Sequence, residues 1–150
     1  MAAGDSKLAQ EYPLQAGKGE YNNSTDAFKI YFCSDTYAAI DVTQTPFNLS
    51  DVTQVGGGNF PITGVSLTSV TWTRSGAVST LDYADLATIN KNASNPATIR
   101  TAVIVNDTST SDDIYKVIDL TSDGSTAIDV VNNDFDYSVN ASGSITGTVA

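Results

Sequence analysis

The side chains in this sequence with the clearest capacity for chemistry are closely spaced aspartates. Three pairs occur along the 150 residues, namely Asp82 with Asp85, Asp112 with Asp113, and Asp134 with Asp136. Two neighbouring carboxylates can serve as the acid and base of a glycoside hydrolase, or as part of a calcium site. The sequence lacks the alternating aspartates, glycine and distal glutamate of an EF-hand loop. We therefore expect these carboxylates to cap turns and to confer solubility, with no catalytic residue, no cofactor and no bound metal.

Other chemistry is poorly supported by the residue types present. The sequence contains no histidine, which removes the usual general base and the commonest transition-metal ligand. Cys33 is the single cysteine and alternates with apolar residues, so we expect a buried structural thiol. The run Gly56–Gly58 lacks the Lys-Ser/Thr pair of a phosphate-binding loop, so we expect only a flexible loop. Trp72 is a candidate platform for a sugar ring, but its phase with Val70 favours a place in the core.

Charge and composition limit the classes of partner. Seventeen acidic and seven basic residues give a net charge of −10, which disfavours binding to nucleic acid and to an anionic membrane. Fifteen of the acids are aspartate and only two, Glu11 and Glu20, are glutamate, an imbalance that favours turns and strands over helices. No stretch is apolar enough to span a membrane, and the first residues lack the apolar segment of a secretion signal. We expect one soluble domain that is synthesised in a cytoplasm.

The elements that must position these residues are predicted to be short strands. In the segment Arg100–Asp107, one face of a strand would carry the β-branched residues Thr101, Val103 and Val105. The opposite face would carry Ala102, Ile104 and Asn106, and this pattern indicates a largely buried strand. Tyr115–Leu120 follows after a polar turn, so the two runs predict a central hairpin. Phe28–Cys33 is a further clear strand, and Asn48–Asp51 is a turn or a short helical piece capped by Asn48 or Ser50.

The rest of the chain extends the same pattern. A change of phase around Thr68 and Ser69 divides Ile62–Arg74 into two strands, or marks a bulge. Additional short strands are expected at Tyr37–Val42, Ile128–Val131, Phe135–Val139 and Ser144–Val149. Many short strands separated by turn residues predict an all-β fold, an antiparallel β-sandwich or jelly-roll-like domain.

Residues 1–27 differ from the rest of the sequence. They contain few large apolar residues and are interrupted by Gly17-Lys18-Gly19 and Asn22-Asn23-Ser24. We expect an extended N-terminal arm of residues 1–27 in front of a β-sandwich body of residues 28–150, either mobile or ordered against another surface. The large apolar residues of this arm are the candidates for such a contact, namely Leu8, Tyr12, Leu14 and Tyr21.

From residue 28 to residue 146, the order of these segments resembles small structural proteins of tailed bacteriophages. The matching segments are FKIYFCS at 28–34, the glycine-rich tip before Ile62-Thr63-Gly64-Val65, LDYADL at 81–86, RTAVIVND at 100–107 with Thr108, YKVIDL at 115–120, and Phe135–Asn140 followed by Ser142-Gly143-Ser144-Ile145. The chain departs from that pattern at Val105, where an aromatic residue is usual, and in carrying residues 1–27 ahead of it.

The resemblance implies a virion protein, with a non-enzymatic capsid decoration (cement) protein as the best match. Such proteins bind the outer surface of the head and brace neighbouring capsomers, often as homotrimers. The implied partners are the major capsid protein and further copies of this chain, with no nucleic acid and no membrane. The implied location is the outer surface of the capsid in the virion, after synthesis in the host cytoplasm. Two alternatives remain: a tail, neck or fibre component with a receptor- or glycan-binding role, and an enzyme that uses an aspartate pair.

Overall fold

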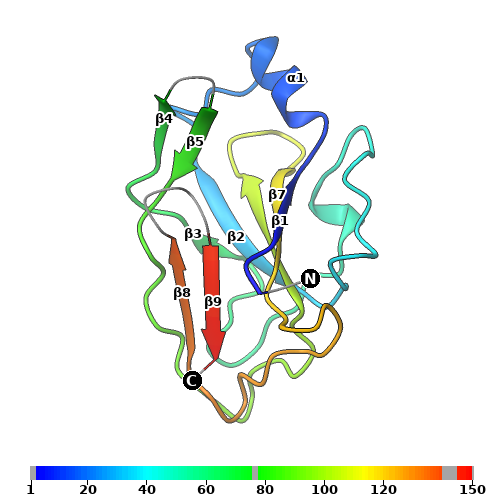
Figure 1. Cartoon of the computed structure of the whole chain (residues 1–150), viewed down its shortest axis with the longest axis vertical. Helices are drawn as coiled ribbons and strands as arrows, with labels where there is room; N and C mark the ends of the chain where they lie inside the picture. Colours follow the sequence, from blue (N-terminus) through cyan, green and yellow to red (C-terminus); the bar gives the residue numbers. More distant parts are fainter. Residues whose placement is uncertain (1–2, 76–77, 140–144, 150) are drawn as a thin grey trace.

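An antiparallel five-stranded sheet with the order β1-β7-β6-β2-β3 forms the centre of the molecule. The computed structural model describes residues 3–75, 78–139 and 145–149 (Figure 1). The sheet strands are β1 (Ser6–Leu8), β2 (Phe28–Cys33), β3 (Val65–Ser66), β6 (Thr101–Asn106) and β7 (Asp113–Asp119). Two hairpins accompany the sheet, β4 (Thr71–Ser75) with β5 (Val78–Asp82), and β8 (Phe135–Val139) with β9 (Ile145–Val149). The helical elements are α1 (Tyr12–Gly17) and the 3-10 helix η1 (Leu49–Asp51).

Both hairpins pack through aromatic rings against one face of the central sheet. Phe135 of β8 meets Phe32 of β2 edge to face, with ring centroids 5.7 Å apart. Trp72 of β4 meets Tyr115 of β7 at 6.2 Å, and Tyr115 in turn contacts Phe28. Because Phe28 and Phe32 project from the same face of β2, the hairpins form a second layer over that face. This arrangement confirms the predicted all-β, sandwich-like fold.

The centre of the sheet is the most apolar part of the chain. All six residues of β6 are buried, and the strand pairs along its whole length with β2 and with β7. The pairing with β7 shifts between Ile104 and Val105, where a bulge leaves Tyr115 without an opposite residue. Cys33 at the end of β2 is fully buried, as predicted for a structural thiol.

The N-terminal segment lies on the body instead of extending away from it. Ser6–Leu8 pairs antiparallel with β7, and the neighbouring amide of Ala9 donates to the carbonyl of Tyr115 at 3.0 Å. The chain then forms α1 (dark blue in Figure 1), in which Tyr12 is buried. Ser-Lys-Leu has no strand pattern of its own, so this strand is fixed by the open edge of β7 and not by local sequence.

Most of the other predicted elements are present. Asn48 caps η1 by accepting from the amide of Ser50, and Asp51 accepts from the amide of Asn48 in return. Ser69, between β3 and β4, has a φ of 53°, where the alternating pattern changes phase. The strands predicted at Tyr37–Val42 and Ile128–Val131 are wrong: both segments are loops, which contribute Ile40, Ile128 and Val130 to the core without pairing as strands.

The glycine-rich loop expected to be flexible is held in place by one side chain. Asn95 is 5% exposed, and its Oδ1 accepts from the amide of Asn59 at 2.8 Å. Its Nδ2 donates to the carbonyls of Val130 at 2.9 Å and Asn90 at 3.1 Å. Gly58, with a φ of 55°, lies so close to this amide that an added Cβ would stand 2.4 Å from Asn95 Oδ1. The loop therefore requires glycine at this position.

Substituting Gly58→Ala is expected to lower the free energy of unfolding by about 1–3 kcal/mol or more, because the left-handed φ and the contact with Asn95 are both unfavourable for a Cβ. Gly17→Ala in α1 is the matched control, since no atom lies within 4 Å of its Cβ position. Urea denaturation of both variants measures the difference. Equal stability of the two variants would contradict the role assigned to Gly58.

Candidate interaction surface

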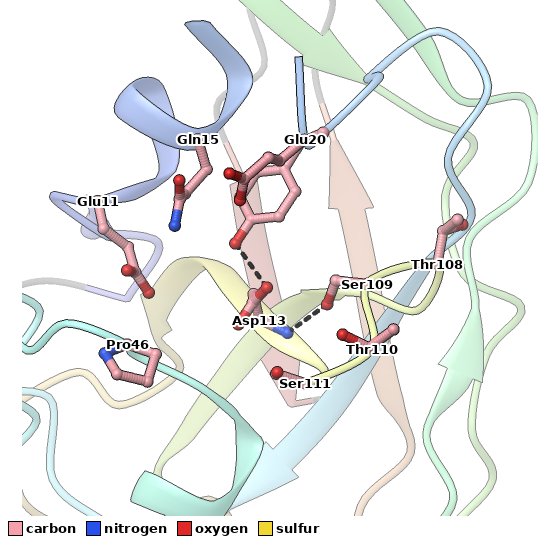
Figure 2. A pocket seen from close by; sticks show the side chains of 10 residues that line it. Glu11, Gln15, Glu20, Pro46, Thr108, Ser109, Thr110, Ser111 and Asp113 are labelled. Atoms are coloured by element: carbon pink, nitrogen blue, oxygen red, sulfur yellow. Dashed lines mark hydrogen bonds between the residues drawn. The ribbon is translucent and has the colours of Figure 1, made fainter. Parts of the chain in front are cut away.

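Helix α1 separates two pockets at one end of the molecule. Tyr12, Pro13 and Ala16 face the first, which we call the apolar pocket; it has a volume of about 340 Å³. Glu11 and Gln15 face the second, the acidic pocket, with a volume of about 320 Å³ (Figure 2). This division follows from the helical repeat, since residues four apart lie on the same side of a helix. The position of α1 thus builds both sites.

The apolar pocket is floored by a cluster of aromatic rings. Tyr12 packs against Tyr21 at 4.7 Å and edge to face against Tyr115 at 4.6 Å, and its hydroxyl donates to Asn23 Oδ1 at 2.5 Å. Burial raises the pKa of Tyr12 well above its ordinary value of 10.0, so this hydroxyl stays protonated at neutral pH. Leu8 and Trp72 complete the wall.

Trp72 lies at the surface, which corrects its predicted place in the core. Its exposed fraction is 37%, and one edge of its ring system contacts Tyr115. The strand that carries it belongs to a two-stranded hairpin, so its side chain is covered from one side only. The alternation of Val70 and Trp72 correctly indicated a strand. It did not indicate how much of that strand other parts of the chain would cover.

The four apolar residues predicted to contact a partner divide into two pairs. Leu8 and Leu14 are 46% and 58% exposed, and remain candidates for such a contact. Tyr12 and Tyr21 are buried in the chain's own core, so in this structure their rings are not available to a partner. The described part of the chain has four exposed large apolar side chains: Leu8 and Trp72 line the apolar pocket, whereas Leu14 and Ile62 line neither pocket.

The acidic pocket is built around a buried hydrogen bond between distant segments. The hydroxyl of Tyr21 donates to Asp113 Oδ2 at 2.5 Å. Burial is the main cause that raises the pKa of this tyrosine, and the hydrogen bond to Asp113 raises it further. The amide of Asp113 donates to Ser109 Oγ at 2.8 Å, which shapes the turn after β6 (Figure 2). Glu11 Oε1 accepts from the amide of Phe47 at 2.5 Å, whereas its Oε2 is buried without a hydrogen-bond partner. Glu20 adds a third carboxylate to the lining.

The remaining candidate residues, the other aspartates and Cys33, make contacts within the chain. The aspartates outside the pocket accept hydrogen bonds from loop and strand groups, namely Asp82 from the amide of Tyr83, Asp85 from the amide of Val139, Asp134 from the amide of Lys91 and Asp136 from the hydroxyl of Thr88. Burial raises the pKa of Cys33 to about 12, so the thiol is protonated at neutral pH. Within the described ranges, no three acidic or cysteine side chains are grouped to hold a metal ion. No helix in the described part of the chain is long and apolar enough to cross a membrane.

Sequence reasoning missed the acidic pocket. Its members come from the N-terminal segment, the loop before η1 and the turn between β6 and β7, and no motif connects them. One signal was present: the only two glutamates, Glu11 and Glu20, both lie in the first twenty residues of a chain whose other acids are aspartates. No family model, curated protein or solved structure matches the chain. The surface itself must therefore carry the functional argument.

The variant Tyr21→Phe is expected to lower the free energy of unfolding by about 1–3 kcal/mol, because Asp113 loses its buried donor. Tyr37→Phe is the control: it keeps the ring that Lys7 approaches at 4.6 Å and removes a hydroxyl outside the pocket. Chemical denaturation at pH 7 compares the two. A loss of stability in Tyr37→Phe as large as that in Tyr21→Phe would contradict the importance of the bond.

Proposed function

We propose that this chain is a non-enzymatic bacteriophage capsid decoration protein, which binds the outer surface of the head and stabilises contacts between capsomers. The observation that carries the proposal is the set of exposed apolar side chains on and beside α1: Leu14 on the helix, and Leu8 and Trp72 in the apolar pocket that the helix borders. Exposed apolar side chains that gather in one place mark interaction sites on proteins. The resemblance of residues 28–146 to tailed-phage structural proteins supplies the identity of the partner, the major capsid protein.

The edge strands of the central sheet favour a partner that binds through side chains over one that adds a strand to the sheet. β1 contributes three residues and β3 only two, and these are the outermost strands of the central sheet. Short edge strands offer few free backbone groups to an incoming strand. Contact with the shell, and association with further copies as a homotrimer, would then depend on the side chains around α1. The charge of −10 suits the outer surface, because the inner one faces packaged DNA.

Quantitative mass spectrometry of purified virions tests the proposal directly. We expect a ratio of this chain to the major capsid protein near one, or another simple large fraction, because a decoration protein must cover the shell. A ratio of a few per hundred would move the chain to the tail or neck. Its absence from the particle would refute the virion assignment.

The surface itself is tested by changing one exposed leucine. Leu14→Ser is expected to weaken binding to heads stripped of this protein by about tenfold, the effect of removing an apolar contact worth about 1.4 kcal/mol. Ile62→Ser is the matched control, since Ile62 is 53% exposed but belongs to the loop before β3, which lies at the opposite edge of the sheet from β1. Co-sedimentation with heads measures both affinities. Equal binding of the two variants would remove α1 from the interface.

A tail, neck or fibre component that binds a glycan is the second candidate, and the exposure of Trp72 favours it. An exposed indole beside Tyr115 and Asn23 combines a face for stacking a sugar ring with a polar group for its hydroxyls. Because Trp72 is the only tryptophan, its fluorescence reports on the apolar pocket directly. A saturable change in fluorescence on titration with host surface polysaccharide, together with loss of binding in Trp72→Ala measured by calorimetry, would establish glycan binding. An unchanged signal would remove this candidate.

A further inference from the structure

We propose that the acidic pocket receives the side chain of an arginine from the partner protein. This inference rests on the proposed function for the source of that arginine, but the chemistry of the pocket stands on the structure. Its starting point is Glu11, which is 6% exposed although its Oε2 has no hydrogen-bond partner. A buried carboxylate oxygen without a donor is unfavourable, and native structures seldom retain one without a reason. Figure 2 shows the carboxyl group pointing between Pro46 and Asp113, into the pocket.

The surroundings of Glu11 are rich in acceptors and lack a cation. Asp113 is 8% exposed, and Glu20 lies on the same wall. No described lysine or arginine forms an ion pair with any of these three carboxylates. Lys18, the lysine nearest in sequence to Glu20, donates instead to Gln15 Oε1 at 3.3 Å. Three carboxylates thus face one hollow with no positive charge bound to them.

Three further cations in the described part of the chain are engaged elsewhere. Lys7 donates to the carbonyl oxygen of Tyr37 at 2.7 Å, and Lys29 is paired with Asp107 at 2.8 Å. The guanidinium of Arg100 donates to backbone carbonyls on its own side of the sheet, including that of Ser34 at 3.0 Å. Since none of the described cations pairs with the carboxylates of the pocket, we seek the donor in a partner.

An arginine fits this pocket better than a metal ion does. The described carboxylates are not grouped closely enough to coordinate a metal. A guanidinium is planar, carries five donors and no acceptor, and reaches acceptors that are spread around a cavity. The hydroxyls of the Thr108–Ser111 turn supply neutral acceptors beside the carboxylates. A volume of about 320 Å³ accommodates such a side chain together with water.

The place of the pocket points to a protein as the source. Residues of α1 line both the acidic pocket and the apolar pocket, so a partner that covers this helix would meet both. Arginine, tryptophan and tyrosine are the side chains that most often dominate binding energy at protein interfaces. The negative charge of the whole chain would also speed the approach of a basic segment.

The test is a titration of the full chain with Nα-acetyl-arginine amide, followed by amide chemical shifts in NMR spectra. We expect saturable shifts at Phe47, Ser111 and Asp113 with a dissociation constant in roughly the millimolar range, as for a single side chain. The neutral isostere Nα-acetyl-citrulline amide is expected to bind at least about tenfold more weakly, because it lacks the charge that the carboxylates attract. Glu11→Gln keeps an oxygen for the amide of Phe47 and removes the charge, so it should weaken arginine binding by about tenfold as well.

Asp129→Asn is the control, since it removes one charge from an exposed turn and should leave the arginine affinity unchanged. Equal binding of arginine and citrulline amides would overturn the inference, as would shifts spread over the whole acidic surface. Unchanged affinity in Glu11→Gln, or tighter binding of Nα-acetyl-lysine amide, would overturn it too. None of these results bears on the copy number in virions, which decides the proposed function separately.

Discussion

The pairing of β6 on both of its edges is the constraint on which the rest of the structure depends. A strand whose six residues are all buried must satisfy every backbone donor and acceptor within the sheet, and β2 and β7 do so. That leaves the far edge of β7 open, and Ser6–Leu8 occupies it. The position of the N-terminal segment, and therefore of α1 and both pockets, is a consequence of completing this sheet.

The strands near the centre were predictable from the sequence because burial requires apolar residues at most of their positions, and such runs are visible in the sequence. Phe28–Cys33 and Thr101–Asn106 carry apolar residues at most positions, and both strands are almost entirely buried. β1 was not predictable, since Ser-Lys-Leu carries no such pattern and its position depends on a strand about 110 residues later in the chain. The same limit applies to the loop at Ile128–Val131, whose apolar residues are buried without forming a strand.

The candidate site was likewise predictable from the sequence only in part. The sequence identified the large apolar residues of the N-terminal segment, but which of them are exposed depends on the aromatic partners that the fold supplies. Tyr12 is covered because Tyr115 lies beside it, whereas Leu14 on the next side of α1 has no such neighbour. The acidic pocket joins Glu11 to Phe47 and Tyr21 to Asp113, contacts that span 36 and 92 positions. Spacing in the sequence carries no information about pairs of that kind.

The anchoring of α1 by its tyrosines has a consequence for how binding would proceed. With Tyr12 and Tyr21 already packed and hydrogen bonded, the docking face is assembled before any partner arrives. Association then requires little loss of backbone entropy, so more of the contact energy is retained as affinity. Its heat-capacity change would reflect the area of the interface alone, without the larger decrease that accompanies coupled folding of a disordered tail. A shell covered by such a protein would gain its stability from preorganised contacts, formed in a single docking step.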